Sequence, residues 1–406
     1  MRRLALPAAG LLLGLSLAAP RAEAVRSALR VYTARDGLPQ LQVTALCQDR
    51  EGYLWVGTLA GGLGRYDGRR FETTDAATGL PGSSIQSVSL GRHGEVLVAT
   101  TNGGAVRAGG AWHVLPQPPG PSPAVNTYLA LPDGRLYAAA SGGLFVAPEI
   151  GAPFEAVAAV GELSGSEVVA LHATPDGVLW AGTTRGLARV LPGGALTRYE
   201  AKGLAERPVG LLAAGRAGRL LVGQTDAGLF ELDPSTGVAR RVGTDGAPGR
   251  NPYRVVSEAD GGGFWIATSD AGAFRWDGRD GFEPFGPAEG LPDARVWTVL
   301  EDREGIVWFG TDSGLAKRGS AAFRTYGPED GLPEAAPVYG MAEAPDGALW
   351  LGAHDRGIVR RAVDGTYRHF TAKDGLPHTE VRSFCVSPSG DVVLTTARGA
   401  ARISNG

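Results

Sequence analysis

Short apolar runs separated by turns recur at a regular interval along the chain. The clearest unit is a turn followed by Gly-x-apolar-Trp-apolar-Gly-Thr, present at Asp49–Thr58 and again at Asp302–Thr311. Weaker copies place an aromatic or aliphatic residue at the Trp position, which gives nine anchors: Trp55, Leu97, Tyr137, Trp180, Leu221, Trp265, Trp308, Trp350 and Val393. Neighbouring anchors are 40 to 44 residues apart, and such self-similarity predicts one repeated structural unit.

Each repeat divides into four short strands. An apolar strand around Val43 ends at an Asp-x-x-Gly or Pro-Asp-Gly turn, such as 175–177, and the Trp strand follows. Turns such as 61–62 and 67–68 then lead to a third strand and an outer fourth. Strands joined by two to four residues are antiparallel. We therefore predict an all-β fold, a β-propeller of four-stranded antiparallel blades, with the nine anchors in the core rather than in a cofactor site.

The two ends of the chain predict how the ring closes. Residues 29–39 match the outer strand and exit loop at 323–333 and 367–377, and the ninth repeat lacks its fourth strand. Pairing 29–33 with 399–404 would remove both exposed edges. This predicts a single domain over 25–406 with nine blades, closed by the N-terminal strand. A solenoid-like array, or a chain cut from a longer parent, is the alternative.

The first 24 residues resemble a leader. Arg2 and Arg3 precede an apolar run from Leu4 to Ala19, and residues 22–24 form a small-x-small cleavage site. This pattern is typical of a cleavable Sec signal peptide, and the run is shorter than the roughly 20 residues of a spanning helix. A membrane anchor is the alternative. We expect a mature protein without an integral membrane segment, located in the periplasm or secreted.

Composition excludes several classes of function. Apolar residues make up 43% of the 406 residues, too many for a disordered chain. The 39 basic and 42 acidic residues leave no wide basic face, so no nucleic acid is expected as a partner. Two cysteines are too few for a disulfide scaffold or a zinc ribbon, and neither a metal nor a cofactor is predicted. Cys47 and Cys385 lie eight residues before their anchors and would meet at the nine-blade seam, where a disulfide is left open.

The phrase Asp-Gly-Leu-Pro, followed by the Trp-Gly-Thr strand, resembles the two-component regulator propeller repeat. Residues 36–58 and 289–311 carry it almost entire, and partial copies continue to Gly406. In that family such propellers are periplasmic sensor regions of membrane-bound histidine kinases, and some sense oligosaccharides. The resemblance implies a ligand-binding or docking propeller. Phosphotransfer is not carried over, because the sequence shows no kinase or cyclase region.

One position per repeat is predicted to face the mouth of the channel. Eleven residues before the anchors stand Thr44, Gln86, Asn126, Val169, Gly210, Arg254, Trp297, Tyr339 and Arg382. The last four would form a ligand sector, because aromatic rings stack on sugars and guanidinium groups bind hydroxyls or acids. The alternative is that the rings fill space between blades while the Arg side chains line a wet channel. Adjacent top loops add candidates, which solvated loop polarity also explains: Asp312, His354, Asp355, Arg356, His378, Glu380 and Arg398.

Three functions follow from this pattern. The first is an extracytoplasmic sensory or scaffold module that binds a small molecule, an oligosaccharide or a membrane sensor protein. The second is a propeller enzyme of lyase or hydrolase type, although no catalytic motif is found; it would require His354, His378 and a carboxylate to converge in one pocket. The third is a structural docking ring, marked by an exposed apolar patch.

Overall fold

The computed structural model describes residues 29–157, 166–190, 194–243, 251–257, 263–279, 281–319, 338–353 and 355–404. Strands and short 3-10 turns are its regular elements, which confirms the all-β prediction. The strands form nine antiparallel sheets, one per repeat. They divide between two compact units, residues 1–323 and 324–406. None of the described residues belongs to a helix that could span a membrane.

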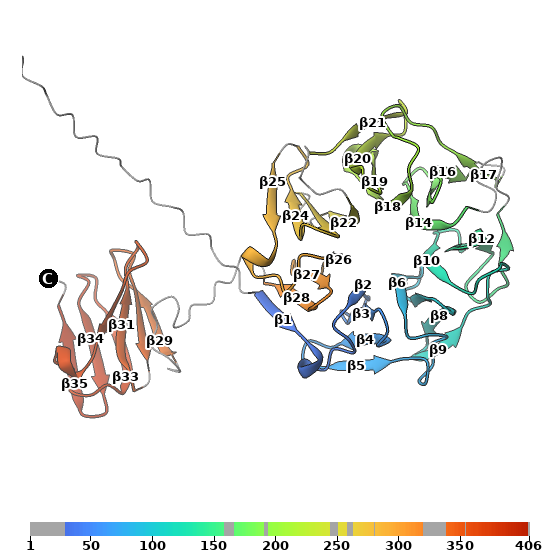
Figure 1. The fold of residues 1–406 in the computed structure, drawn as a ribbon. Helices are drawn as coiled ribbons and strands as arrows, with labels where there is room; N and C mark the ends of the chain where they lie inside the picture. Colours follow the sequence, from blue (N-terminus) through green and yellow to red (C-terminus); the bar gives the residue numbers. More distant parts are fainter. Residues whose placement is uncertain are drawn as a thin grey trace, which may run out of the picture. The chain divides into compact units, whose positions relative to one another are not determined.

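The first unit is a ring of seven blades (Figure 1). In the first blade, β2 (Val43–Gln48), β3 (Leu54–Thr58), β4 (Leu63–Tyr66) and β5 (Phe71–Thr74) pair in sequence order from the centre outward. Blades two to four repeat this order with β6 (Ile85–Leu90), β7 (Val96–Thr100), β8 (Gly103–Ala108), β9 (Ala111–Val114), β10 (Val125–Ala130), β11 (Leu136–Ala140), β12 (Gly143–Ala147), β13 (Glu155–Ala156), β14 (Val168–Ala173), β15 (Leu179–Thr183), β16 (Gly186–Val190) and β17 (Leu196–Arg198).

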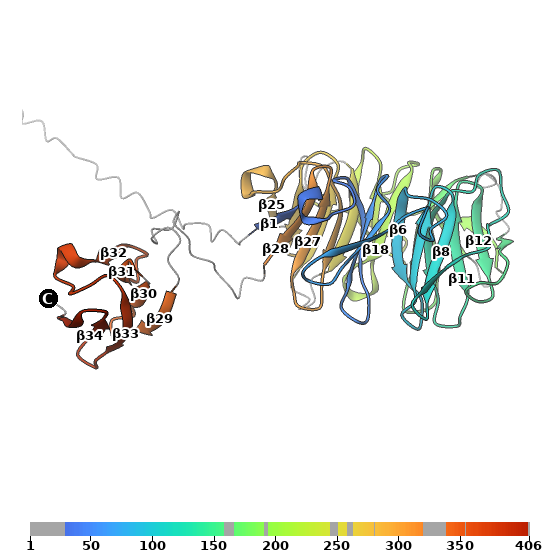
Figure 2. The same ribbon diagram turned by 90° about the horizontal axis from the view of Figure 1, so that it is seen from below.

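Blades five and six continue with β18 (Val209–Ala214), β19 (Leu220–Gln224), β20 (Gly228–Asp233), β21 (Val238–Arg241), β22 (Pro252–Ser257), β23 (Phe264–Thr268), β24 (Ala273–Trp276) and β25 (Phe282–Phe285). Figure 2 shows this ring edge-on, with the strands running between its two faces. Turns at the start of the inner strands therefore lie on one face, and the turns between the first and second strands lie on the other.

The ring closes after seven blades, which corrects the predicted nine. Blade seven consists of β26 (Val296–Glu301), β27 (Val307–Thr311), β28 (Gly314–Arg318) and the N-terminal strand β1 (Leu29–Tyr32). β1 pairs antiparallel with β28, from Leu29 opposite Arg318 to Tyr32 opposite Leu315. The N-terminal strand thus closes a ring as predicted, but its partner is 314–318 and not 399–404. Pairing removes the exposed edge of β28.

The second unit contains the last two repeats. One sheet is β29 (Val338–Glu343), β30 (Leu349–Ala353), β31 (Gly357–Arg361) and β32 (Tyr367–Phe370), and the other is β33 (Val381–Val386), β34 (Val392–Thr396) and β35 (Gly399–Ile403). Their facing sides share a hydrophobic core that includes Trp350, Ile358 and Leu394. The prediction of one nine-bladed ring over 25–406 is therefore wrong in its closure, although all nine sheets are present.

The anchor residues explain why the repeat has its sequence. Eight of the nine are buried, and only Val393 in the last repeat is exposed. The Trp55 indole donates to Asp49 Oδ2 at 2.7 Å, while Asp49 Oδ1 accepts from the Tyr53 backbone N–H at 2.9 Å. Trp308 and Asp302 repeat the indole bond at 2.7 Å. One carboxylate therefore fixes both the turn and the large side chain. The prediction that the anchors are core residues is confirmed for eight of the nine and wrong for Val393.

The Asp-Gly-Leu-Pro phrase forms a capped turn. The Thr33 backbone N–H donates to Asp36 Oδ2 at 2.9 Å, Gly37 has φ of 91°, and Leu38 is buried. Residues 371–376 repeat the turn, with Gly375 at φ of 97°. Glycine fits this left-handed conformation without the strain that a side chain would bring. Where the phrase occurs, it thus shapes the entry to the inner strand that follows.

Candidate functional site

A cavity of about 210 Å³ lies between the seven inner strands of the ring. The structure places seven of the nine predicted positions along it: Thr44, Gln86, Asn126, Val169, Gly210, Arg254 and Trp297. In six of these repeats the residue is the extra one in a break of register, as at Thr44 between Val43 and Ala45. A bulge bends its strand and re-aims its side chain, so the bulge explains why this position varies beside a constant core neighbour.

Arg254 reaches the cavity from a different register position. In β22 the break falls between Pro252 and Arg254, so residue 253 is the bulged one and Arg254 pairs with Ala267. Repeat six is longer by one residue before Trp265, and counting back eleven residues therefore selects the next position. Arg254 lines the cavity and its side chain is exposed to the channel.

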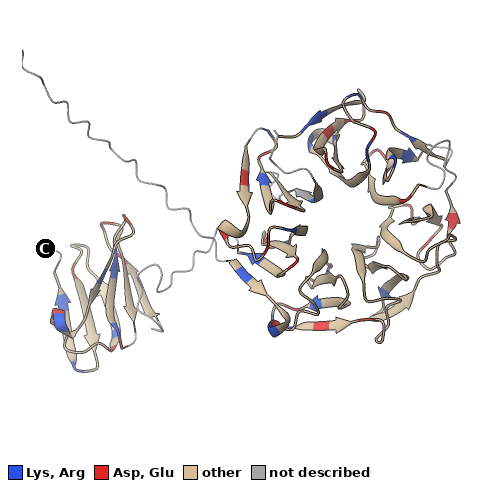
Figure 3. Ribbon diagram, viewed as in Figure 1, with Lys and Arg blue, Asp and Glu red and all other residues tan. Residues whose placement is uncertain are grey.

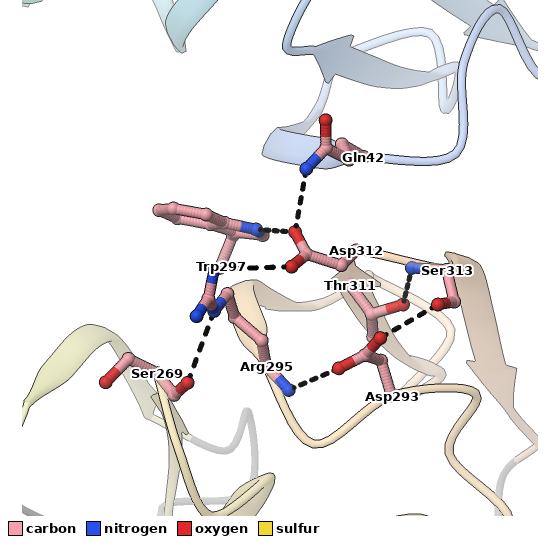
Figure 4. A network of polar contacts seen from close by, with 8 residues as sticks. All are labelled: Gln42, Ser269, Asp293, Arg295, Trp297, Thr311, Asp312 and Ser313. Atoms are coloured by element: carbon pink, nitrogen blue, oxygen red, sulfur yellow. Dashed lines mark hydrogen bonds and ion pairs between the residues drawn. The ribbon is translucent and has the colours of Figure 1, made fainter.

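Trp297 is held at the start of β26 by a carboxylate from the adjacent turn (Figure 4). Its indole Nε1 donates to Asp312 Oδ1 at 2.6 Å, and Gln42 Nε2 from the first blade donates to the same oxygen at 3.2 Å. Asp312 follows directly after β27. Two predicted site residues, Trp297 and Asp312, are thus in contact, and Gln42 joins them across the seam between blades seven and one.

Arg295 completes this cluster. Its guanidinium lies 3.5 Å from Asp312 Oδ2 and 5.8 Å from the centre of the Trp297 ring, a cation–π distance. It also contacts the Ser269 carbonyl oxygen of blade six at 3.4 Å. Asp293 accepts from the Arg295 backbone N–H at 2.9 Å and from Ser313 Oγ at 2.8 Å, and the first of these bonds lowers the pKa of its carboxyl group. The mouth cluster, defined as Gln42, Arg295, Trp297 and Asp312, therefore joins three blades.

The remaining predicted residues lie in the second unit, so the predicted four-residue sector is divided. Tyr339 and Arg382 line a cavity of about 130 Å³ between β29 and β33. Arg382 Nε donates to Glu380 Oε1 at 3.2 Å, and His378 Nδ1 accepts from the Glu380 backbone N–H at 3.1 Å. His354 lies outside the described residues. The turn residues that complete the set are Asp355, which has φ of 58°, Arg356 and Arg398.

Comparison with known proteins agrees with this architecture. The family described as two component regulator propeller matches residues 37–60 and 290–313. The first segment begins in an Asp-Gly-Leu-Pro turn and the second in a Glu-Gly-Leu-Pro turn, and each ends just after a Trp strand. The chain contains two-component regulator propeller repeats.

Solved structures with the same fold include extracellular domains and lyases. The propeller repeats superpose on the extracellular domain of a putative hybrid two component system from B. thetaiotaomicron with a TM-score of 0.62 and 17% identity, covering 93% of this chain and 59% of that one. A putative one component system from the same organism gives 0.58 and 19%, covering 89% and 51%. The chain thus spans between half and three fifths of those domains.

A virginiamycin B lyase from Staphylococcus aureus gives a TM-score of 0.58 at 13% identity, covering 71% of this chain and 97% of that one. At these identities the likeness shows the fold alone. Comparison with curated proteins finds no match.

Sequence reasoning on the propeller repeats missed two members of the mouth cluster. Gln42 and Arg295 occupy the same repeat position, thirteen residues before Trp55 and Trp308. Both precede the first core residue of their inner strand and therefore stand beside the channel mouth. Counting two positions farther back from the variable residue would have found them.

Both cysteines are free thiols. Cys47 lies in the inner strand of blade one, where burial raises the pKa of its thiol to about 11. Cys385 belongs to β33 of the second unit. Because the ring of propeller repeats closes between β1 and β28, the two residues do not flank its seam, and the idea of a disulfide that locks the closure is wrong.

Proposed function

We propose that this chain is an extracytoplasmic ligand-binding propeller, a sensory or scaffold module whose site is the mouth cluster. The observation that carries the proposal is the Trp297 indole, fixed by Asp312 beside the cavity and flanked by Arg295. A pre-positioned aromatic ring with polar groups around it is the usual composition of a sugar-binding surface. The likeness to extracellular sensor domains supports the location and the sensory role.

The geometry favours a ligand that enters the cavity end-on. Its volume of about 210 Å³ is below the range of roughly 300–1,000 Å³ common for drug-sized ligands. One sugar unit or a small polar molecule is therefore the appropriate size for the interior. A longer oligosaccharide would extend over the mouth, where Gln42 and Arg295 supply hydrogen-bond donors.

The location follows from the leader. Residues 1–24 lie outside the described residues, so the signal peptide stays a prediction from sequence. We place the mature chain in the periplasm or outside the cell, where it would present the ligand-bound state to a membrane sensor or another partner protein. The lyase-type alternative rests on the fold, because His354 is not described and His378 belongs to the second unit.

The test is the thermal midpoint of purified residues 25–406 with a panel of neutral and acidic saccharides. A ligand that binds only the folded state raises the midpoint. We expect the shift to disappear in Trp297→Ala and to persist in Tyr53→Ala, which removes a ring at the opposite end of a blade. A shift that survives Trp297→Ala contradicts the site. If no saccharide gives a shift, the docking alternative is favoured and pull-down of a partner protein is the next measurement.

A further inference from the structure

The cavity has one charged residue among its described lining. Besides Arg254 and the Trp297 ring, the lining consists of hydroxyl and amide groups, such as Ser87 and Asn126, and of aliphatic side chains. The inner strands of the first five blades contain no Lys, Arg, Asp or Glu, and Figure 3 shows them tan. A guanidinium group therefore stands alone in a channel of neutral groups.

The positive charge is not neutralised by the described part of the ring. No carboxylate among the described residues forms an ion pair or hydrogen bond with Arg254, and the one group that acts on it electrostatically is Cys47. Burial keeps that thiol protonated at neutral pH, since its pKa is about 11. Enclosure by the ring lowers the pKa of the guanidinium itself. A lone cationic group that faces the channel among neutral groups attracts negative charge, so an anion in the channel would be stabilised.

There is room for an anion beside the guanidinium. Gly210 lies on the inner strand of the neighbouring blade five, and a Cβ built on it meets no atom within 4 Å. Gln86, on the far side of the ring in blade two, is exposed to the same cavity and makes no hydrogen bond through its side chain with another described residue. A free amide and a free guanidinium thus face one space from opposite sides.

We propose that the channel binds a small monovalent carboxylate, with Arg254 as its counter-charge and the Gln86 amide as a hydrogen-bond donor. The inference rests on the proposed function and adds the charge and size of the ligand. A guanidinium presents two parallel N–H groups that match a carboxylate. One cation balances one negative charge, and the cavity volume limits the ligand to a few carbon atoms or a single acidic sugar.

The experiment compares matched pairs of acid and neutral ligand by titration calorimetry on residues 25–406. The pairs are lactate with propane-1,2-diol and glucuronate with glucose, each at constant ionic strength, with sulfate as the salt control. We expect at least one acid to bind at least tenfold more tightly than its neutral partner. Equal affinity for acid and neutral partner, or equal affinity for sulfate, overturns the proposal.

Three variants locate the site. Arg254→Gln should weaken acid binding at least tenfold, and Arg69→Gln, at an exposed turn, should leave it unchanged. Gly210→Leu fills the space beside the guanidinium without backbone strain, because Gly210 is not in the left-handed region, and should also abolish binding. It keeps the test valid if Arg254→Gln alters the fold. Acid binding that survives both cavity variants overturns the proposal. Neutral saccharides that bind through Trp297 and are insensitive to Arg254→Gln would overturn it too, while leaving the proposed function intact.

Discussion

At the scale of single residues, the repeat is maintained by hydrogen bonds that a hydropathy pattern does not show. Asp49 is buried, and its two oxygens accept from an indole and from a backbone N–H. Removing them leaves two donors without partners. We expect Asp49→Ala to lower the free energy of unfolding by about 1–3 kcal/mol, measured by urea denaturation. Glu51→Ala, an exposed change in the same turn, is the control. Equal effects of the two substitutions would contradict this account.

A second residue makes stability depend on pH. Burial lowers the pKa of His172 on β14 from its ordinary value of 6.5. The unfolded chain therefore binds this proton at a higher pH than the folded chain does. The contribution of the neutral His172 imidazole to folding stability is complete above pH 6.5 and declines as the pH falls toward the folded-state pKa. We expect His172→Gln to reduce the loss of stability between pH 7 and 5, measured by thermal melts across that range.

His113, exposed on β9, provides the control for this pH dependence. His113→Gln should leave the acid-side slope as it is in the unmodified protein. An identical slope in His172→Gln would show that other groups cause the acid destabilisation.

At the scale of strands and blades, the main question is where the ring closes. Arg303 of blade seven donates to the carbonyl oxygens of Arg50 and Asp49, each at 2.7 Å, and its backbone N–H donates to Gln48. Tyr32 of β1 packs against Tyr66 of blade one and against Trp308 of its own blade. These contacts join the first and seventh blades, and they account for closure after the seventh repeat.

Deleting residues 25–33 tests this closure. The edge of β28 would lose its partner, so its amide protons should exchange at least tenfold faster, while those of β35 (Gly399–Ile403) should not change. We also expect the free energy of unfolding to fall by about 3–5 kcal/mol, the usual effect of removing a buried aromatic side chain such as Tyr32. Faster amide exchange in β35 instead of β28 would contradict closure after seven blades and support the predicted nine-bladed ring.

The sequence was sufficient to predict the blades, but it was not sufficient to predict which strands close the ring. Turn chemistry and anchor spacing predict every sheet, because both are local properties of one repeat. Closure is not local: residues 29–39 match the ends of two other repeats as well, and a strand pattern does not say which edge it will join. The four predicted site residues fall in two units for the same reason, because the repeat pattern does not show which blades share a ring. Trp297 reaches the mouth as predicted. Arg254 occupies its place because the connection between β22 and β23 has one added residue, and Tyr339 is absent from the mouth because it belongs to the other unit.

At the scale of the whole molecule, the chain combines a closed ring with two further blades. Among the residues that the structure describes, seven hydrophobic clusters draw only on the ring and one draws only on the second unit. The second unit exposes apolar side chains along β29, with Tyr339 at 65% and Met341 at 68%. Its two sheets share one core, so they should unfold together rather than with the ring.

This separation predicts that residues 25–323 fold without the rest. The described hydrophobic clusters of the ring include no residue of the second unit. The fragment should therefore melt within about 5 °C of the ring transition of the full chain, a shift that corresponds to roughly 3 kcal/mol or less for a domain of this size. Near-ultraviolet circular dichroism should retain the signal of its buried Trp residues, Trp55, Trp180, Trp265, Trp276 and Trp308. Ligands that bind at Trp297 or Arg254 should keep their affinity. A fragment without a cooperative transition would mean that the last two blades are part of the ring's stability, and the division into two units would then be wrong.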